Sequence, residues 1–368
     1  MIVYYLIFIV ISLFCYQEIY NPKPLNIFSF VFLTILFSLF IGFRNEIGCD
    51  WEGYKKIFEL TNCIPNIGNN QCDFNSINNF FDYIKFKEIG YTSLNYIVKK
   101  FGGNFYTLQY ISSLFFVIPF LYFCSNLKRP FLAILISYPY LITVIGLSSI
   151  RQSIAIAFLM LCLTELKKNK FKAYYLYNFM GSIFHYSSLI FIFLPLLIQE
   201  AGNQKFKKIK KLMIIVPFIF ILLFLIFNYD FLISKLNGYL NYTKPISLKS
   251  PLIVWTMVTI PSAIILCNYK YFKSEDKNKF WRNYSIIGIL MFFSIFFNNI
   301  IALRFLLYFI PIKIYAFSNL TEIKIFHKNP RIVYLAIIFF SMSFLTIWLN
   351  FANHSYCYLP YKNLLLRY

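Results

Sequence analysis

Apolar segments alternate with polar loops along almost the whole chain. A helix needs about 20 mostly apolar residues to cross the hydrocarbon core of a bilayer. Segments of nearly this length occur at residues 2–16, 26–43, 105–123, 131–146, 152–166, 212–227, 251–267, 284–301, 305–320 and 332–349. The pattern predicts an all-α fold, a polytopic transmembrane helix bundle of about ten spans that forms one domain, residues 1–368.

One further apolar segment, residues 173–198, has polar residues at its centre, from His185 to Ser188. Loops rich in Lys and Arg tend to stay in the cytoplasm. If this segment crossed once, thirteen basic residues of the later loops would lie outside, against six if the chain returned to the cytoplasm. Irregular backbone at membrane depth is tolerated only where protein or water surrounds it. We therefore predict a re-entrant hairpin with His185 near its tip.

Basic residues in the earlier loops predict the orientation. Lys23, Lys128 and the lysines between positions 167 and 172 fall on one side of the bilayer if each preceding segment crosses once. That side is predicted to be the cytoplasm. Both termini and the polar loop 44–104 are then outside. The first segment has no basic residue before it and no small-residue cleavage site, so we expect it to remain as a helix.

Composition narrows the class of protein further. Hydrophobic residues make up 59% of the chain and charged residues 13%, with a mean hydropathy of +0.63. In a soluble domain about a quarter of the residues are charged, so this composition excludes a soluble globular protein. The net charge of +21 comes mainly from the loops between apolar segments, a pattern typical of contact with anionic membrane lipid. We therefore expect no nucleic-acid partner.

The predicted topology gathers polar residues at the outer face, and each has a plain structural alternative. Arg44 could be a helix-end anchor whose charge reaches the interface. Asp50 and Tyr54 are spaced four apart and could form only a local contact, while Glu88 could be a solvated loop residue. The remaining residues of the set are Tyr91, Arg151, Gln152, Arg304 and the tail 360–362.

Arg151 and His185 have the strongest chemical case. Ser148 and Ser149 can cap the helix that follows, which would leave its positive end facing outward beside the Arg151 guanidinium. Such a helix end binds diphosphate-type anions well. A lone His is usually a hydrogen-bonded core residue, but an ionisable group inside the membrane at a chain break favours function.

These residues occur in sequence stretches that resemble the EpsG-like and Wzy-type family of bacterial polysaccharide polymerases. The stretches are FRNEIGCDWEGYKKIF (43–58), EIGYTSLNYIVKKFG (88–102), SSIRQSIAIAFLMLCL (148–163), FHYSSLIFIFLP (184–195), RFLLYF (304–309) and YLPYK (358–362). They follow one another in the family's order and run through most of the chain. The resemblance implies a fold of the GT-C class of membrane glycosyltransferases.

The activity that the resemblance implies is polymerisation of lipid-linked oligosaccharide repeat units at the outer face of the bacterial cytoplasmic membrane. The growing chain, held on a polyprenyl diphosphate, would move to the terminal sugar of the next unit. Guanidiniums can bind the diphosphate, and a carboxylate or His can take the acceptor's proton. We expect phosphate binding by Arg44, Arg151 and Arg304, help from Tyr54, Tyr91 and Gln152, and catalytic roles for His185, Asp50 and Glu88.

No metal and no cofactor is expected, because the sequence has no Asp-x-Asp pair and no His/Cys ligand spacing. Candidate partners are a flippase and chain-length regulator proteins, besides the polyprenyl-diphosphate-linked oligosaccharide and membrane lipid. The alternatives are a polysaccharide flippase or other transporter, an O-antigen ligase or lipid-linked mannosyltransferase, and a non-catalytic membrane subunit of an export complex. A transporter should show internal repeats, and no clear repeat is present.

The eight cysteines fall into two groups. Cys15, Cys124, Cys162 and Cys267 lie in or beside apolar segments and are expected to be small core residues. Cys49, Cys63, Cys72 and Cys357 are expected outside, where a disulfide persists in an oxidising compartment. Cys63 and Cys72 are the preferred pair, because they close a short polar loop.

Overall fold

The computed structural model describes residues 1–20, 24–61, 88–198, 248–273 and 279–366, with Ile215, Phe218 and Ile233 as isolated positions. Within these ranges the regular elements are all helical, which confirms the predicted all-α bundle. The first half contains α1 (Ile2–Tyr20), α2 (Ile27–Gly42), α3 (Trp51–Leu60), α5 (Ile89–Lys100), α6 (Phe105–Ser125), α7 (Pro130–Ser137), the π-helix η2 (Tyr138–Ile145), α8 (Gly146–Ser148), α9 (Ile150–Lys167), α10 (Phe171–Phe184) and the 3₁₀ helix η3 (Tyr186–Leu197).

The second half follows the predicted segments closely. Its elements are α13 (Lys249–Cys267), α14 (Tyr269–Phe272), α15 (Phe280–Leu290), η4 (Met291–Phe293), α16 (Ser294–Phe297), α17 (Asn299–Leu306), η5 (Leu307–Phe309), α18 (Ile310–Ser318), η6 (Leu320–Glu322), α19 (Lys324–His327), α20 (Pro330–Phe351), η7 (Ser355–Tyr358) and η8 (Leu364–Leu366). Among the described residues, seven helices are long and apolar enough to cross a membrane. The predicted segment 212–227 lies outside the described residues except for Ile215 and Phe218.

The break between the predicted segments 284–301 and 305–320 was placed wrongly, at residues 302–304. The chain turns instead at Asn298, whose backbone is extended and whose side-chain oxygen accepts hydrogen bonds from Ile300 N and Ile301 N, both at 3.0 Å. An asparagine in this position satisfies the free amides that begin a helix. Arg304 therefore lies within α17, and the following span runs over Asn299–Ser318.

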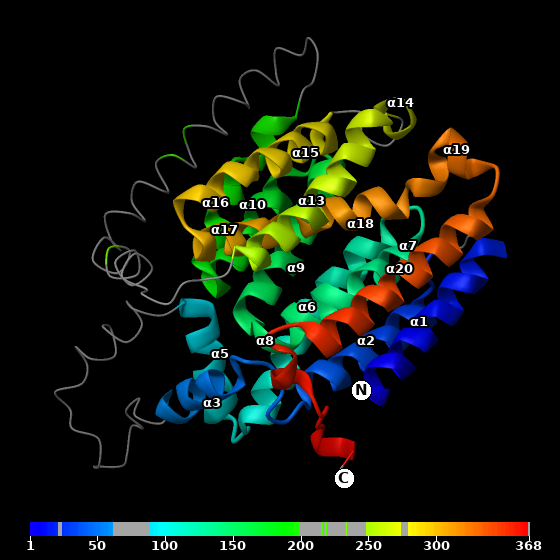
Figure 1. The fold of residues 1–368 in the computed structure, drawn as a ribbon. Helices are drawn as coiled ribbons and strands as arrows, with labels where there is room; N and C mark the ends of the chain where they lie inside the picture. The colour runs from blue at the N-terminus through cyan, green and yellow to red at the C-terminus, as the bar shows by residue number, and fades with distance from the viewer. Residues whose placement is uncertain are drawn as a thin grey trace, which may run out of the picture.

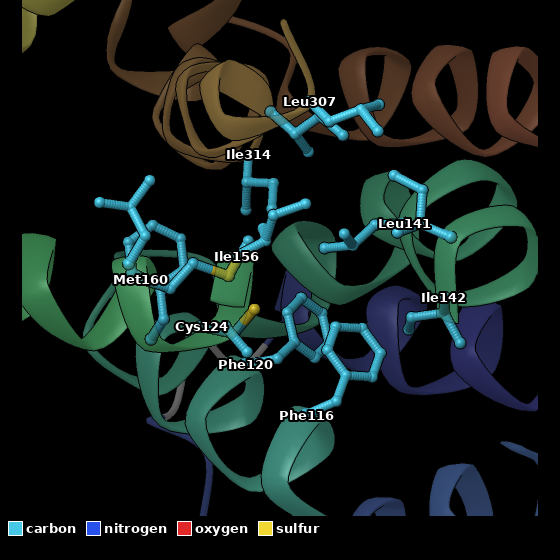
Figure 2. Close-up of a cluster of buried hydrophobic side chains, with 14 of the residues drawn as sticks. Phe116, Phe120, Cys124, Leu141, Ile142, Ile156, Met160, Leu307 and Ile314 are labelled. Atoms are coloured by element: carbon cyan, nitrogen blue, oxygen red, sulfur yellow. The ribbon is translucent and has the colours of Figure 1, made fainter. Parts of the chain in front are cut away.

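The core lies where α6, η2, α9 and α18 meet. Figure 2 shows Phe116 and Phe120 of α6 beside Leu141 of η2, with Ile156 of α9 and Ile314 of α18 on the other side. All five side chains are almost completely inaccessible to solvent. Inside a bilayer such a core is held by close van der Waals packing between the helices, because the surrounding lipid is as apolar as the side chains. The core fixes α9, and α9 carries Arg151 at its beginning.

One end of the bundle, the basic end, gathers the loops that contain Lys128 and Lys168 together with the start of α20. There the buried carboxylate of Glu18 accepts hydrogen bonds from the backbone amides of Phe131 and Leu132, and from the Tyr334 hydroxyl. A carboxylate suits a helix N-terminus, because the first amides of a helix lack partners within it. Glu18 thus joins α1, α7 and α20.

The opposite end, the site end, gathers both ends of the chain (Figure 1). Tyr4 donates a hydrogen bond to the carbonyl of Tyr358 at 2.8 Å, and the Tyr138 hydroxyl donates to the carbonyl of Tyr4 at 2.8 Å. The loop after α2 and the beginning of α9 lie at this same end, because Ser149 contacts Asp50 there. That this end faces outward stays a prediction.

The chain reverses its direction at His185. Tyr174 of α10 hydrogen-bonds to the carbonyl of Phe191 in η3, and Asn178 hydrogen-bonds to the carbonyl of Ser188 at 3.4 Å. At the end of η3, Leu197 accepts a hydrogen bond from Asn283, close to the basic end. The two arms thus form a hairpin at 171–197 with its turn at the site end. Its re-entrant placement in a bilayer stays a prediction.

This arrangement yields a labelling prediction for chains whose only cysteines are Cys49, Cys357 and one introduced probe. We expect Asn169→Cys and Gln204→Cys, on either side of the hairpin, to resist an impermeant maleimide added outside, and Glu52→Cys to react. The measurement is the labelled fraction in intact cells. Reaction at Gln204→Cys without reaction at Asn169→Cys would contradict the hairpin. Gln204 and the basic group 205–211 lie outside the described residues.

Candidate functional site

The site is centred on Glu88, a buried carboxylate that contacts two other predicted residues. One oxygen, Oε1, lies 2.6 Å from Nδ1 of His185. The other oxygen, Oε2, forms an ion pair with Nη1 of Arg151. Glu88 is 2% exposed, so water screens neither contact of its carboxylate strongly. Three residues that are 34 and 63 positions apart in sequence thus form one connected group.

Backbone conformation at element ends directs the three side chains toward one another. Glu88 is the extended residue before α5, and His185 is the extended residue between α10 and η3. Arg151 lies in the first turn of α9. All three therefore project from places where a helix begins or ends. The predicted side-chain cap of α9 is wrong, because the Ser149 side chain makes no hydrogen bond to the first amides of the helix. The Ser149 hydroxyl faces Asp50 Oδ2 at 3.4 Å instead.

A close approach of α5 to α10 holds Glu88 next to His185. A Cβ on Gly90 would lie 3.0 Å from the backbone of Ile183, whereas a Cβ on Gly53 would meet nothing within 4 Å. We expect Gly90→Ala to destabilise the protein by about 1–3 kcal/mol through overpacking. It should also weaken activity, because the new methyl group moves α5 away from α10.

The matched control is Gly53→Ala, which adds the same methyl group to a helix in open space. It should leave stability unchanged or raise it by about 0.5–1 kcal/mol. Thermal unfolding and polymer yield, measured for both variants, check the prediction. Equal behaviour of the two variants would show that the approach at Gly90 is not tight.

Arg304 lies beside this group, and two hydrogen bonds fix the helical segment that carries it. The Gln152 side chain, next to Arg151, donates to the backbone carbonyl of Arg304 at 2.8 Å. One turn later, the Tyr308 hydroxyl is 2.9 Å from the Ser187 hydroxyl, two residues after His185. The charge of Arg304 acts on both His185 and Tyr308. Tyr308 and Ser187 were not predicted as site residues, although the spacing of four places Arg304 and Tyr308 on one helix face.

Two tyrosines line the other side of Arg151. The guanidinium carbon of Arg151 lies 5.5 Å from the ring centroid of Tyr54, and the Tyr54 ring meets the Tyr91 ring edge-on at 5.4 Å. Burial raises the pKa of Tyr54 above its usual value, so its hydroxyl stays protonated at neutral pH. Tyr91 is buried as well. An aromatic face under a guanidinium restricts its orientation and attracts its charge.

Arg44 differs from the prediction that it projects outward. Its side chain is fully buried, and its Nε and Nη1 donate to the backbone carbonyls of Ile47 and Ile41. Burial lowers its pKa to about 10, which still leaves it protonated at neutral pH. These contacts close the end of α2 and shape the loop that follows. In this structure Arg44 supports the site end from within instead of presenting its charge at the surface.

The cysteine prediction also changes. A disulfide joins Cys49 to Cys357, residues 308 positions apart. Sequence analysis placed both on the outer side but preferred the pair Cys63 and Cys72, which lies outside the described residues. Spacing in the sequence favoured the short loop, whereas the fold brings the C-terminal segment onto the loop after α2. The free cysteines among the described residues are Cys15, Cys124, Cys162 and Cys267.

The site offers two partly exposed arginines, Arg151 and Arg304, whereas Arg44 is fully buried against backbone carbonyls. The buried carboxylate of Glu88 pairs with Arg151, and the exposed Asp50 faces Ser149. The Arg151 side chain keeps 29% of its surface exposed, so it can meet a ligand while it contacts Glu88. In the described part of the chain, no group of three or more His, Cys, Asp or Glu residues is close enough to hold a metal ion.

Comparison with known protein families agrees with the resemblance found in the sequence. A family model described as EpsG family matches residues 27–363, nearly the whole chain. The chain belongs to the EpsG family. This EpsG protein is therefore a membrane protein of polysaccharide biosynthesis. No curated protein and no solved structure matches it, so the predicted GT-C-like fold stays a prediction.

Proposed function

We propose that this EpsG protein polymerises polyprenyl-diphosphate-linked oligosaccharide units at the outer face of the cytoplasmic membrane. The observation that carries the proposal is the position of Glu88 between His185 and Arg151. It places a group able to accept a proton and a group able to bind phosphate around one buried carboxylate. Family membership supports the same class of chemistry.

His185 is suited to act as the general base. When Nδ1–H donates to Glu88 at 2.6 Å, Nε2 carries the lone pair that can accept a proton. Nε2 is buried and has no hydrogen-bond partner among the described residues. Glu88 fixes the tautomer and ring orientation in the way that a carboxylate orients histidine in other enzymes. His185 would remove the proton from the acceptor hydroxyl as its oxygen attacks the anomeric carbon of the growing chain.

Arg151 and Arg304 are suited to bind the diphosphate that leaves. As the acceptor oxygen bonds to the anomeric carbon, the bond from that carbon to the diphosphate oxygen breaks, and negative charge develops on the diphosphate. Guanidiniums placed there stabilise the transition state more than the ground state. The Tyr54 ring lies against the Arg151 guanidinium, and Gln152 holds the backbone of Arg304 through its carbonyl. Asp50, at the beginning of α3, would help to position the acceptor.

An apolar cavity beside Arg304 supports a lipid carrier. It measures about 410 Å³ and lies between η3, α15 and α17. Phe191, Leu194, Met291, Phe305 and Phe309 are among the residues that line it, and Phe305 directly follows Arg304. A polyprenyl chain would bury its apolar surface there, while its diphosphate remains at the arginines.

The decisive experiment combines a deletion strain with a reconstituted reaction. We expect the wild-type gene to restore long surface polysaccharide and Arg151→Ala to leave single repeat units, at equal membrane levels. Purified protein in vesicles should lengthen lipid-linked repeat units that are supplied on the side of the bilayer that carries the site end. Transfer of repeat units across the bilayer without lengthening would indicate a flippase. Normal polymer from Arg151→Ala would indicate a non-catalytic subunit.

A further inference from the structure

The C-terminal segment, residues 354–366, is attached along its length to the loop at 43–50. Besides the disulfide, three main-chain hydrogen bonds join them: Asn45 N to Lys362 O at 3.0 Å, Gly48 N to Cys357 O at 2.8 Å, and Leu364 N to Phe43 O at 2.8 Å. Side chains add an ion pair between Lys362 and Glu46 at 2.6 Å and a hydrogen bond from Tyr361 to the carbonyl of Phe40 at 2.7 Å. The loop and the segment therefore form one unit.

This unit leads directly to the site. Gly48 has a positive φ of 94°, and a Cβ there would lie 2.1 Å from the carbonyl oxygen of Leu147, so the loop presses against the chain just before α9. Asp50 follows and faces Ser149. The next turn carries Tyr54, the ring beneath Arg151. The loop thus contacts Leu147 and Ser149, which lie just before the helix of Arg151.

The helix α3 depends on this loop for its position. Only Trp51, Tyr54 and Phe58 of its ten residues are buried. These three rings pack against Phe105 and Tyr91. A helix of ten residues is too short to be stable alone in water, so its position depends on these contacts and on the residues that anchor its beginning. Cys49 lies two residues before α3. The disulfide at Cys49 therefore adds a covalent restraint to the beginning of α3, beside the packing of Tyr54 on Tyr91.

We propose that the disulfide-linked C-terminal segment is a positioning element of the site, and that the oxidation state of Cys49 and Cys357 controls its affinity for the diphosphate ligand. The inference rests on the proposed function. A dithiol reductant gives two electrons and two protons to the bond between the two sulfur atoms, which leaves two thiols and an oxidised dithiol. Reduction removes the covalent restraint at the beginning of α3, so that Tyr54 restricts the Arg151 guanidinium less tightly.

The first measurement follows the anchoring of the loop and α3, and it does not require the protein to be active. Hydrogen exchange is compared in the purified full-length protein before and after reduction with dithiothreitol. We expect faster exchange in residues 45–60 and no change in α13, which is far from the segment along the chain. Cys357→Ser should behave as the reduced wild type and should no longer respond to dithiothreitol. Cys162→Ser, which removes a buried free thiol, should respond as the wild type does.

The second measurement follows the ligand, with polyprenyl diphosphate as the probe. We expect its dissociation constant to rise roughly 10- to 100-fold on reduction, as it does when a supporting contact behind a binding residue is lost. In the polymerase reaction the loss should appear mainly in KM, because the diphosphate group is held less well before the reaction. Re-oxidation should restore both values.

Two results would overturn the inference. Unchanged exchange in residues 45–60 after reduction would show that the disulfide does not position α3, whatever reaction the protein catalyses. An unchanged affinity for polyprenyl diphosphate, in a protein where Arg151→Ala abolishes binding, would show that α3 does not affect the arginine. If Arg151→Ala binds as the wild type does, the proposed function fails, and the exchange measurement alone decides whether the segment positions α3.

Discussion

His185→Gln is expected to stop chain growth while the protein inserts and folds normally. Glutamine can keep a hydrogen bond to Glu88 but cannot take up a proton near neutral pH. Loss of a general base lowers a rate by about 10²–10⁴-fold. Polymer length and membrane protein level are measured together. His327→Gln is the matched control, because His327 lies at the basic end and its ring nitrogen meets only the carbonyl of Thr321 among the described residues.

His185→Leu separates the two roles that His185 can have. A merely structural histidine would tolerate glutamine, and only the leucine variant would then reduce the protein level, because it removes the buried hydrogen bond to Oε1 of Glu88. Normal polymer from His185→Gln would therefore reject the general base. A silent but well-inserted His185→Gln protein would agree with it.

Arg151→Lys is expected to lower polymer formation roughly 100-fold or more, since one charge-stabilising donor typically contributes 10²–10³-fold to a rate. Lysine keeps the positive charge but loses the planar fork that can meet Glu88 and a phosphate at once. Arg331→Lys is the matched control, because the Arg331 guanidinium also lies over a tyrosine, Tyr20, at 4.9 Å, but at the basic end. Donor-dependent polymerisation in vesicles is the measurement.

Full-length polymer from Arg151→Lys would show that charge alone suffices at this position. Arg151 would then act as an anchor and not as a ligand of the diphosphate. Reduced polymer from Arg331→Lys to the same degree would indicate a general effect of arginine loss on the bundle. Each of the two arginines lies over a tyrosine, so the comparison isolates the contact of Arg151 with Glu88.

Much of the fold could be predicted because the bilayer imposes a simple pattern. The apolar segments at 105–123 and 251–267 became α6 and α13 with small shifts in their boundaries. The break near residue 302 was misplaced because the residues on both sides of Asn298 are equally apolar, and only the cap at Asn298 identifies the turn. Hydropathy cannot detect a single capping side chain.

The membership of the site was easier to predict than its geometry. Glu88, Arg151 and His185 were all named from the sequence, and the structure brings them together. That Glu88 would bridge the other two could not be predicted, because the bridge depends on how closely α5 and α10 approach at Gly90. Arg44 was placed at the surface because it follows an apolar helix, yet the tail covers it. Contacts between residues 300 positions apart leave no local pattern.

The disulfide also has a consequence for the order in which the protein is made. Cys49 and the beginning of α3 emerge from the ribosome early, whereas Cys357 follows α20. The loop before α3 must therefore remain without its covalent partner while the intervening helices enter the membrane. The contacts among Arg151, Glu88 and His185 can form before the disulfide does, but the covalent restraint near Tyr54 cannot. The site would thus be completed only when synthesis of the chain is almost finished, so that a partly made protein would not yet hold Tyr54 firmly beneath Arg151.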